Sequence, residues 1–221
     1  MDIQITEQII IMLAALVLLT AFAMLVQRKI YGLISLFMWQ GIFLALTTAF
    51  VGYIAHRYHL YISAVLTLLL KVILLPYILR MLIIKLKISR EVESVVNVTS
   101  TMLIGIALVI FSYQLTAPIR QNSAFVAQSI IAIALATVMI GLLMMITRRN
   151  AVTQIIGFLA MENGLFFAAI SATYGMPLVV ELGVAIDILI AAFVFGIFSL
   201  HINTTFDSLD VDKMAQLKED Y

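Results

Sequence analysis

Three ionisable side chains of this 221-residue sequence fall deep inside long apolar segments. Glu162 lies 11 residues after Ala151, and a helix rising 1.5 Å per residue would carry it to a depth of about 16 Å. Asp187 lies ten residues after Pro177, at about 15 Å, and Lys71 lies equally deep in an earlier segment. The hydrocarbon core of a bilayer is about 30 Å thick, so all three are expected near its midplane.

Charges at that depth favour proton or ion chemistry. Each costs about 2.5–3.5 kcal/mol on insertion scales, so such residues usually face protein or water and mark relays and ion paths. We expect Glu162 and Asp187 to exchange protons through water, with Lys71 as the counter-charge and gate. The alternative is that Lys71 neutralises a buried carboxylate and only stabilises the fold.

Two further residues are candidates for the same site. Pro76 follows Lys71 by five residues; it lacks an N–H and clashes with the carbonyl of Val72, so the helix should kink or open there. Glu181 lies about 6 Å into a segment that begins at Pro177, near the positive end of the helix dipole. It fits an N-terminal stabilising role and a relay role equally well.

The composition is that of a polytopic membrane protein. Hydrophobic residues make up 64% of the chain and charged residues 11%, against about 25% charged residues in soluble domains. The chain has no cysteine, which excludes disulfides, thiolate-bound iron–sulfur clusters and cysteine zinc sites. His56, His59 and His201 fall at segment ends, where interfacial placement is expected. We therefore expect no cofactor and no metal site in this chain, and the net charge of +1 does not suggest a nucleic-acid partner.

The fold class predicted is all-α, because backbone groups in lipid must be satisfied within each segment. About seven transmembrane helices are expected, over 8–27, 30–55, 60–84, 99–117, 124–147, 151–174 and 177–202. The first follows Asp2 and Glu7 without a basic stretch or a cleavage site, so we expect it to be retained rather than removed as a signal peptide.

The positions of Lys and Arg predict the orientation. Of the 13 such residues, Lys71 lies within a segment, and Arg57 and Arg120 fall on one side of the predicted bundle. The others fall on the opposite side: Arg28, Lys29, Arg80, Lys85, Lys87, Arg90, Arg148, Arg149, Lys213 and Lys218. The positive-inside rule then places the N-terminus outside and the C-terminus in the cytoplasm.

The longest internal polar stretch, 88–100, is the best candidate for a boundary between two parts of the chain. The predicted organisation is a three-helix N-terminal part with a cytoplasmic linker (1–97), a fourth helix with an outer turn (98–123), a three-helix unit (124–202) and a cytoplasmic tail (203–221). Within the second segment, Gln40, Thr47 and Thr48 are interpreted as interhelical hydrogen-bonding residues.

Several of these motifs resemble known families. The three-helix unit over 124–202 is similar to the three-helix subunit K of respiratory complex I and to the matching small subunit of multi-subunit cation/proton antiporters. The residues that carry this similarity are Arg148-Arg149-Asn150, Gly157, Asn163, a last helix ending in His201, and the tail Leu209-Asp210-Val211-Asp212. The whole chain more closely resembles hydrogenase-4 component E of membrane-bound formate hydrogenlyase. The residues that carry this resemblance are Lys71 with Pro76, Met161-Glu162-Asn163-Gly164, Glu181, Asp187 and the tail Leu209-Asp210-Val211-Asp212.

The resemblance implies a membrane subunit of a complex-I-like hydrogenase in the cell membrane, without catalytic residues of its own. Its expected partners are other membrane subunits, including antiporter-like pump subunits, and indirectly a NiFe-hydrogenase peripheral arm. The acids of subunit K would align with Leu159 and near Ala191, about one helical turn from Glu162 and Asp187 and on the same faces. The relay role can therefore carry over, with H⁺ or Na⁺ as the ion. The alternatives are an antiporter subunit without redox chemistry and a purely structural scaffold subunit.

Overall fold

The structure, a computed structural model, describes residues 3–85, 92, 94–118, 125–173, 183 and 189. Every regular element in these ranges is a helix, which confirms the predicted all-α fold class. The elements are α1 (Ile3–Val26), α2 (Ile30–Ile54), α3 (Tyr58–Thr67), the π-helix η1 (Leu68–Leu74), α4 (Leu75–Lys85), α5 (Val98–Leu115), α7 (Phe125–Thr147) and α8 (Ala151–Thr173).

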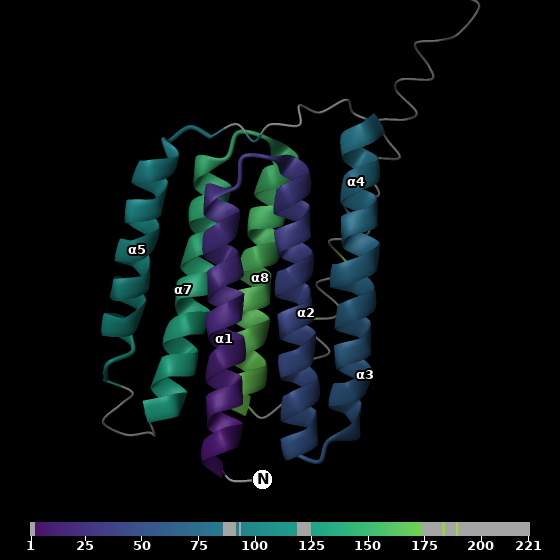
Figure 1. Cartoon of the computed structure of the whole chain (residues 1–221), viewed down its shortest axis with the longest axis vertical. Helices are drawn as coiled ribbons and strands as arrows, with labels where there is room; N and C mark the ends of the chain where they lie inside the picture. Colours follow the sequence, from purple (N-terminus) through teal and green to yellow (C-terminus); the bar gives the residue numbers. More distant parts are fainter. Residues whose placement is uncertain are drawn as a thin grey trace, which may run out of the picture.

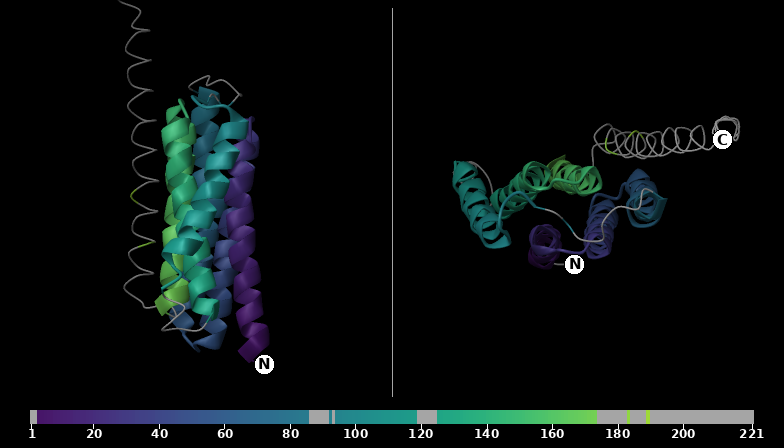
Figure 2. Two further views of the ribbon diagram at one scale, coloured as in Figure 1. Left: turned by 90° about the vertical axis from the view of Figure 1, so that its left-hand side faces the viewer. Right: turned by 90° about the horizontal axis from the view of Figure 1, so that it is seen from above.

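The helices stand side by side in two curved layers. Seen from above in Figure 2, α5, α7 and α8 form one layer, and α1, α2 and the continuous α3–η1–α4 rod form the other. Helix α1 packs against α7, and α2 packs against α8, which joins the layers (Figure 1). Residues far apart in the sequence, such as those of η1 and α8, can therefore meet inside the bundle.

Six helical segments of the described residues are long and apolar enough to cross a membrane. They correspond to the first six predicted segments, and the chain is a multi-pass membrane protein. The seventh, over 177–202, lies outside the described residues except for Gly183 and Leu189. The predicted orientation and the predicted division of the chain stay predictions.

The third membrane-spanning rod changes its helical winding halfway along. Residues Tyr58–Ile84 form one span, but η1 interrupts the α-helical pattern between α3 and α4. At the end of η1 the N–H of Leu75 donates to the carbonyl of Leu70, five residues back. Pro76 comes next and has no N–H to donate. The π-helix therefore ends just before the proline, which cannot donate a backbone hydrogen bond. Lys71 is the central residue of this π-helix.

Two apolar clusters fill the bundle, one toward each end. The first includes Leu33, Phe37, Leu79, Met144 and Ile156, and it draws on α1, α2, α4, α7 and α8. The second includes Val17, Leu44, Leu60, Phe166 and Ile170. Both clusters contain residues of α1, α2, α7 and α8. Polar side chains that lie between the two clusters along these helices therefore form a separate layer.

Glycines allow α7 and α8 to approach each other closely. A Cβ atom on Gly141 would lie 2.6 Å from the backbone nitrogen of Met161, and one on Gly164 would lie 3.0 Å from the backbone nitrogen of Val138. In membrane proteins, small residues at helix contacts let the two backbones approach closely. Such close packing matters there because an apolar side chain is about as stable against lipid as against another helix. This contact fixes α8, and with it Glu162, relative to α7.

We expect Gly141→Ala to destabilise the protein by about 1–3 kcal/mol, because the methyl group would collide with the rigid backbone at Met161. The measurement is thermal unfolding of the detergent-purified protein. Gly32→Ala is the matched control, since its methyl group would meet only the flexible end of Gln27. Equal melting temperatures for the two variants would contradict the close-packing argument.

Candidate functional site

Lys71 and Glu162 form an ion pair inside the bundle, between η1 and α8. The Nζ atom of Lys71 donates to Oε2 of Glu162, and the two side chains are 0% and 6% exposed. The partners are 91 residues apart in sequence. The sequence predicted both residues at the same depth but left open whether they meet, and the structure brings them together.

Amide side chains extend the pair across the bundle. Lys71 Nζ also donates to Oδ1 of Asn163 at 2.7 Å, and Nδ2 of Asn163 donates to Oε1 of Gln40 at 2.9 Å. Nε2 of Gln40 then donates to the carbonyl of Val17 on α1 at 3.5 Å. Lys71, Asn163 and Gln40 are each fully buried. In this chain of hydrogen bonds, each donor group points away from the ammonium of Lys71 and toward the next residue, so each bond polarises the next.

Three local features position Lys71. The π-turn around it changes the face on which its side chain leaves the helix. Gly41 lets α2 come close: a Cβ atom there would lie 3.1 Å from Cβ of Lys71. The ring of Phe166, one turn after Glu162 on α8, lies under the ammonium with its centroid 5.3 Å from Nζ, within cation–π range.

The ring of Phe166 also connects the site to the last predicted segment. A Cβ atom on Gly183 would lie 2.4 Å from Cδ2 of Phe166, so the backbone at Gly183 lies directly against the ring. Gly183 lies between Glu181 and Asp187 in the sequence, but both acids fall outside the described residues. Their predicted contribution to the site therefore stays a prediction.

Buried hydroxyls lie on the Lys71 side of the third rod. Ser63 and Thr67 precede Lys71 by eight and four residues, a spacing that follows one helix face, and their hydroxyls have no hydrogen-bond partner among the described residues. Nine other serine and threonine hydroxyls in the described helices or at their ends donate to a carbonyl three or four residues earlier: those of Thr20, Thr47, Thr48, Thr101, Ser112, Thr116, Thr137, Thr147 and Thr153. The hydroxyls of Ser63 and Thr67 are thus buried without being used by their own helix.

The described residues of the site can separate and exchange charge, and they offer no ligand set for a metal. Among the described residues no group of three His, Cys, Asp or Glu side chains could hold a metal ion. The polar layer of Lys71, Glu162, Asn163 and Gln40 lies between the two apolar clusters, which shield it from both ends. Such a layer holds a carboxylate, an ammonium and two amides, groups that can take up, release and stabilise a proton.

A mycobacterial relative matches most of the chain. The protein named "Uncharacterized protein Rv0085" from Mycobacterium tuberculosis is 32% identical over 194 residues, which cover 87% of this chain and 88% of the relative. The two proteins belong to one family. The name of this relative states no activity, so the function is argued from the geometry of the site.

A second similarity covers about half of the chain. Hydrogenase-4 component E of Escherichia coli and that of Shigella flexneri are each 32% identical over 101 residues, 46% of this chain and 47% of theirs. No protein-family model matches the chain, and no solved structure is similar to it. The site of this Rv0085 family member is therefore described from its own geometry.

Sequence reasoning missed part of the site. Gln40 was expected to make interhelical hydrogen bonds but was not linked to Lys71, and Ser63, Thr67 and Phe166 were not singled out. The spacing of Ser63, Thr67 and Lys71 at every fourth residue was a usable signal. Of the three histidines, His56 lies at the α2–α3 turn with a φ of 50°, His59 lies in the first turn of α3, and His201 is outside the described residues.

Removing one partner of the ion pair should destabilise the protein more than removing both. Lys71→Met leaves Glu162 buried without its counter-charge, at an expected cost of about 3–5 kcal/mol. The double variant Lys71→Met/Glu162→Leu should recover most of that loss in thermal unfolding of the purified protein. A double variant no more stable than Lys71→Met would show that the pair is not the source of the cost.

Proposed function

We propose that this protein is a membrane subunit of a complex-I-like hydrogenase complex of the cytoplasmic membrane, in which the Lys71–Glu162 pair belongs to a proton or cation relay. The observation that carries the proposal is a buried ammonium–carboxylate pair between two apolar clusters, in which Lys71 lies at the centre of a π-helix and Glu162 lies on α8. π-turns occur often at functional sites, and intramembrane ionisable residues mark ion pathways. The similarity to hydrogenase-4 component E supports the kind of complex.

The pair can act as a charge switch. When Glu162 accepts a proton, its attraction for Lys71 falls, and the ammonium keeps Asn163 and the ring of Phe166 as partners. When the proton leaves toward the next acceptor, the ion pair forms again. The π-turn lacks the tight bonding of an α-helix and so supports a small movement of Lys71 between these arrangements.

Two further elements of the relay are proposed on either side of the pair. Water held by Ser63 and Thr67 would give protons access along α3. On the other side, Asp187 is the proposed next acid, with Glu181 at the end of its helix. Support comes from the contact of Gly183 with Phe166, because Gly183 lies between these two acids in the sequence. Antiporter-like pump subunits are the proposed partners that receive the signal.

The test compares ion uptake by inverted vesicles that contain the assembled complex, with electron transfer followed in parallel. Glu162→Gln keeps the size of the side chain but cannot carry the negative charge, so ion uptake per electron should fall at least tenfold while electron transfer continues. Glu7→Gln, which removes a carboxylate near the start of α1, is the matched control and should behave as wild type.

If Glu162→Gln assembles and couples normally, the buried pair is scaffolding and the proposed relay is wrong. A different outcome is that ion uptake falls in Glu162→Gln while ion uptake by the wild type does not depend on electron transfer. In that case the protein serves a cation/proton antiporter rather than a hydrogenase.

The hydroxyl path makes a separate prediction. Thr67→Val removes a hydroxyl but keeps the branched shape, so water next to Lys71 should be lost and the initial rate of proton uptake should fall several-fold. Thr47→Val is the control, because the hydroxyl of Thr47 already donates to the carbonyl of Phe43 and is not available to water as a donor. Equal rates in both variants would exclude access along α3.

A further inference from the structure

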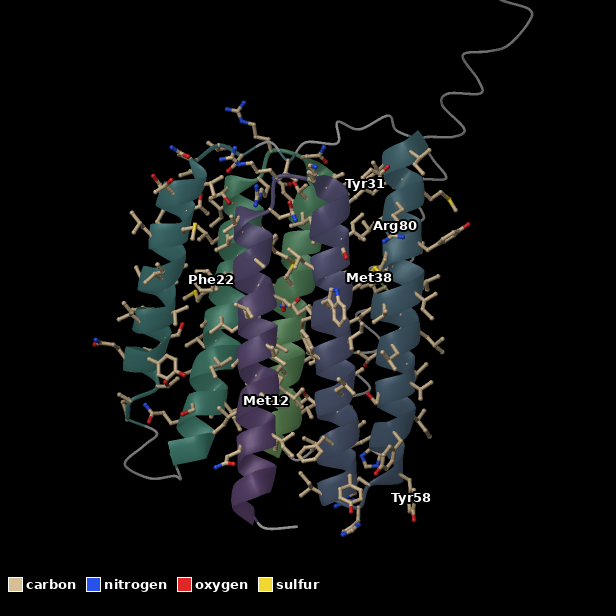
Figure 3. All side chains as sticks on the ribbon, viewed as in Figure 1. Met12, Phe22, Tyr31, Met38, Tyr58 and Arg80 are labelled. Atoms are coloured by element: carbon tan, nitrogen blue, oxygen red, sulfur yellow. The ribbon has the colours of Figure 1, made fainter. Side chains whose placement is uncertain are left out.

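A cavity of about 790 Å³ opens at the end of the bundle where α1 turns into α2. Its wall is made by the α1–α2 turn, the start of α5, the linker before α5 and Arg148 after α7: the lining residues include Gln27, Arg28, Lys29, Tyr31, Ser94 and Arg148. Figure 3 shows Tyr31 at this end of the bundle, opposite to Tyr58. The volume is within the range of about 300–1,000 Å³ that small-ligand sites occupy.

The cavity is held open by hydrogen bonds that pin the linker to both layers. The N–H of Val92 donates to the carbonyl of Arg28 at 2.8 Å, and the N–H of Val95 donates to the carbonyl of Thr147 at 2.8 Å. The hydroxyl of Ser94 also donates to that carbonyl, at 3.2 Å. The wall is therefore part of the fold, formed where three separate stretches of the chain meet.

The charge of the lining is positive. Arg28, Lys29 and Arg148 all line the cavity, and no acidic residue is among its described lining residues. The side chains of Arg28 and Lys29 are exposed and form no ion pair with another described residue. Cations gathered on one wall, with no carboxylate among the described lining residues, are suited to an anion.

Arg148 is a buried cation in the wall of the cavity, and one of its N–H donors has no hydrogen-bond partner among the described residues. Its side chain is only 3% exposed, and its Nη2 donates to the carbonyls of Met24 and Leu25 at 3.1 and 2.7 Å. Its Nε has no hydrogen-bond partner among the described residues. Burial lowers the pKa of Arg148 from its ordinary value, but a guanidinium stays protonated in proteins. The buried guanidinium in the wall of the cavity thus has one N–H donor without a partner among the described residues.

The cavity lies at the level where the membrane spans end. The spans of α1, α2, α5, α7 and α8 stop or start at Val26, Ile30, Val98, Thr147 and Ala151, next to its lining residues. In a bilayer, the phosphate groups of phospholipids lie just beyond the ends of the hydrocarbon core that such spans cross. From the cavity toward the bundle centre, α5 presents the exposed apolar residues Met102, Leu103 and Ile106, a surface on which acyl chains could lie.

We propose that this cavity binds the phosphate of an anionic phospholipid, with the exposed Arg28 and Lys29 as its donors and the buried guanidinium of Arg148 as a further positive charge in the wall. Basic pockets between transmembrane helices at the cytoplasmic side are suited to anionic headgroups. The lipid joins the α1–α2 turn to the α7–α8 turn and so stabilises the contact between the two layers. The site is separate from the Lys71–Glu162 pair, and the proposal does not depend on the relay.

The test measures thermal stability and lipid adducts of the purified full chain. Dioleoyl phosphatidylglycerol should raise the melting temperature and appear as a bound adduct in native mass spectra, whereas dioleoyl phosphatidylcholine should do neither. In the double variant Arg28→Gln/Lys29→Gln, which keeps the buried Arg148, the affinity for phosphatidylglycerol should fall by about tenfold or more.

Arg149→Gln is the matched control, since Arg149 is an exposed cation on the α7–α8 turn, next to Arg148, but does not line the cavity. It should bind the lipid as wild type does. Equal stabilisation by glycerol 3-phosphate without acyl chains would assign the site to a soluble phosphate compound and overturn the lipid proposal. Equal losses in the Arg149 variant and the double variant, or no preference for phosphatidylglycerol, would overturn it as well. If an acidic peptide from another subunit displaces the lipid and binds more tightly, the cavity is a protein-docking site instead.

Discussion

The burial of Lys71 and Glu162 is the constraint on which the rest of the structure depends. Either charge alone inside a membrane would cost several kcal/mol, so the bundle must bring the two together and satisfy their remaining hydrogen-bonding groups. Asn163, Gln40 and the carbonyl of Val17 do this in a chain that reaches α1. The ion pair therefore fixes how η1, α8, α2 and α1 are placed relative to one another, in addition to any part it takes in ion movement.

Close helix contacts make this geometry possible. The glycines of α7 and α8 set the distance between those two helices, and Gly41 sets the distance between α2 and Lys71. Apolar packing on both sides of the polar layer then excludes water from most of its surface. In such surroundings a proton that arrives or leaves has a large electrostatic effect, because little solvent screens it. The same packing leaves the third rod, with its π-turn, as the part best able to respond.

The second concentration of charge, at the end of the bundle, acts differently. Arg148 ties the turn between α7 and α8 to the last carbonyls of α1, where the helix dipole is negative. Arg28 and Lys29 are exposed beside it, close to the level of lipid headgroups. The described charges in the middle of the bundle, Lys71 and Glu162, are therefore paired within the protein, whereas Arg28 and Lys29 at this end are exposed beside the cavity.

Much of the fold followed from the sequence. Long apolar segments between charged turns predicted six described helices, since lipid permits few other backbone structures, and helical rise placed Lys71 and Glu162 at one depth. The sequence could not predict that these two side chains meet, that Gln40 completes their network, or that the hydroxyls of Ser63 and Thr67 have no partner among the described residues. Depth depends on one helix alone, but contact depends on how each helix is rotated and which helices are neighbours. Only the packing of the bundle decides those two quantities.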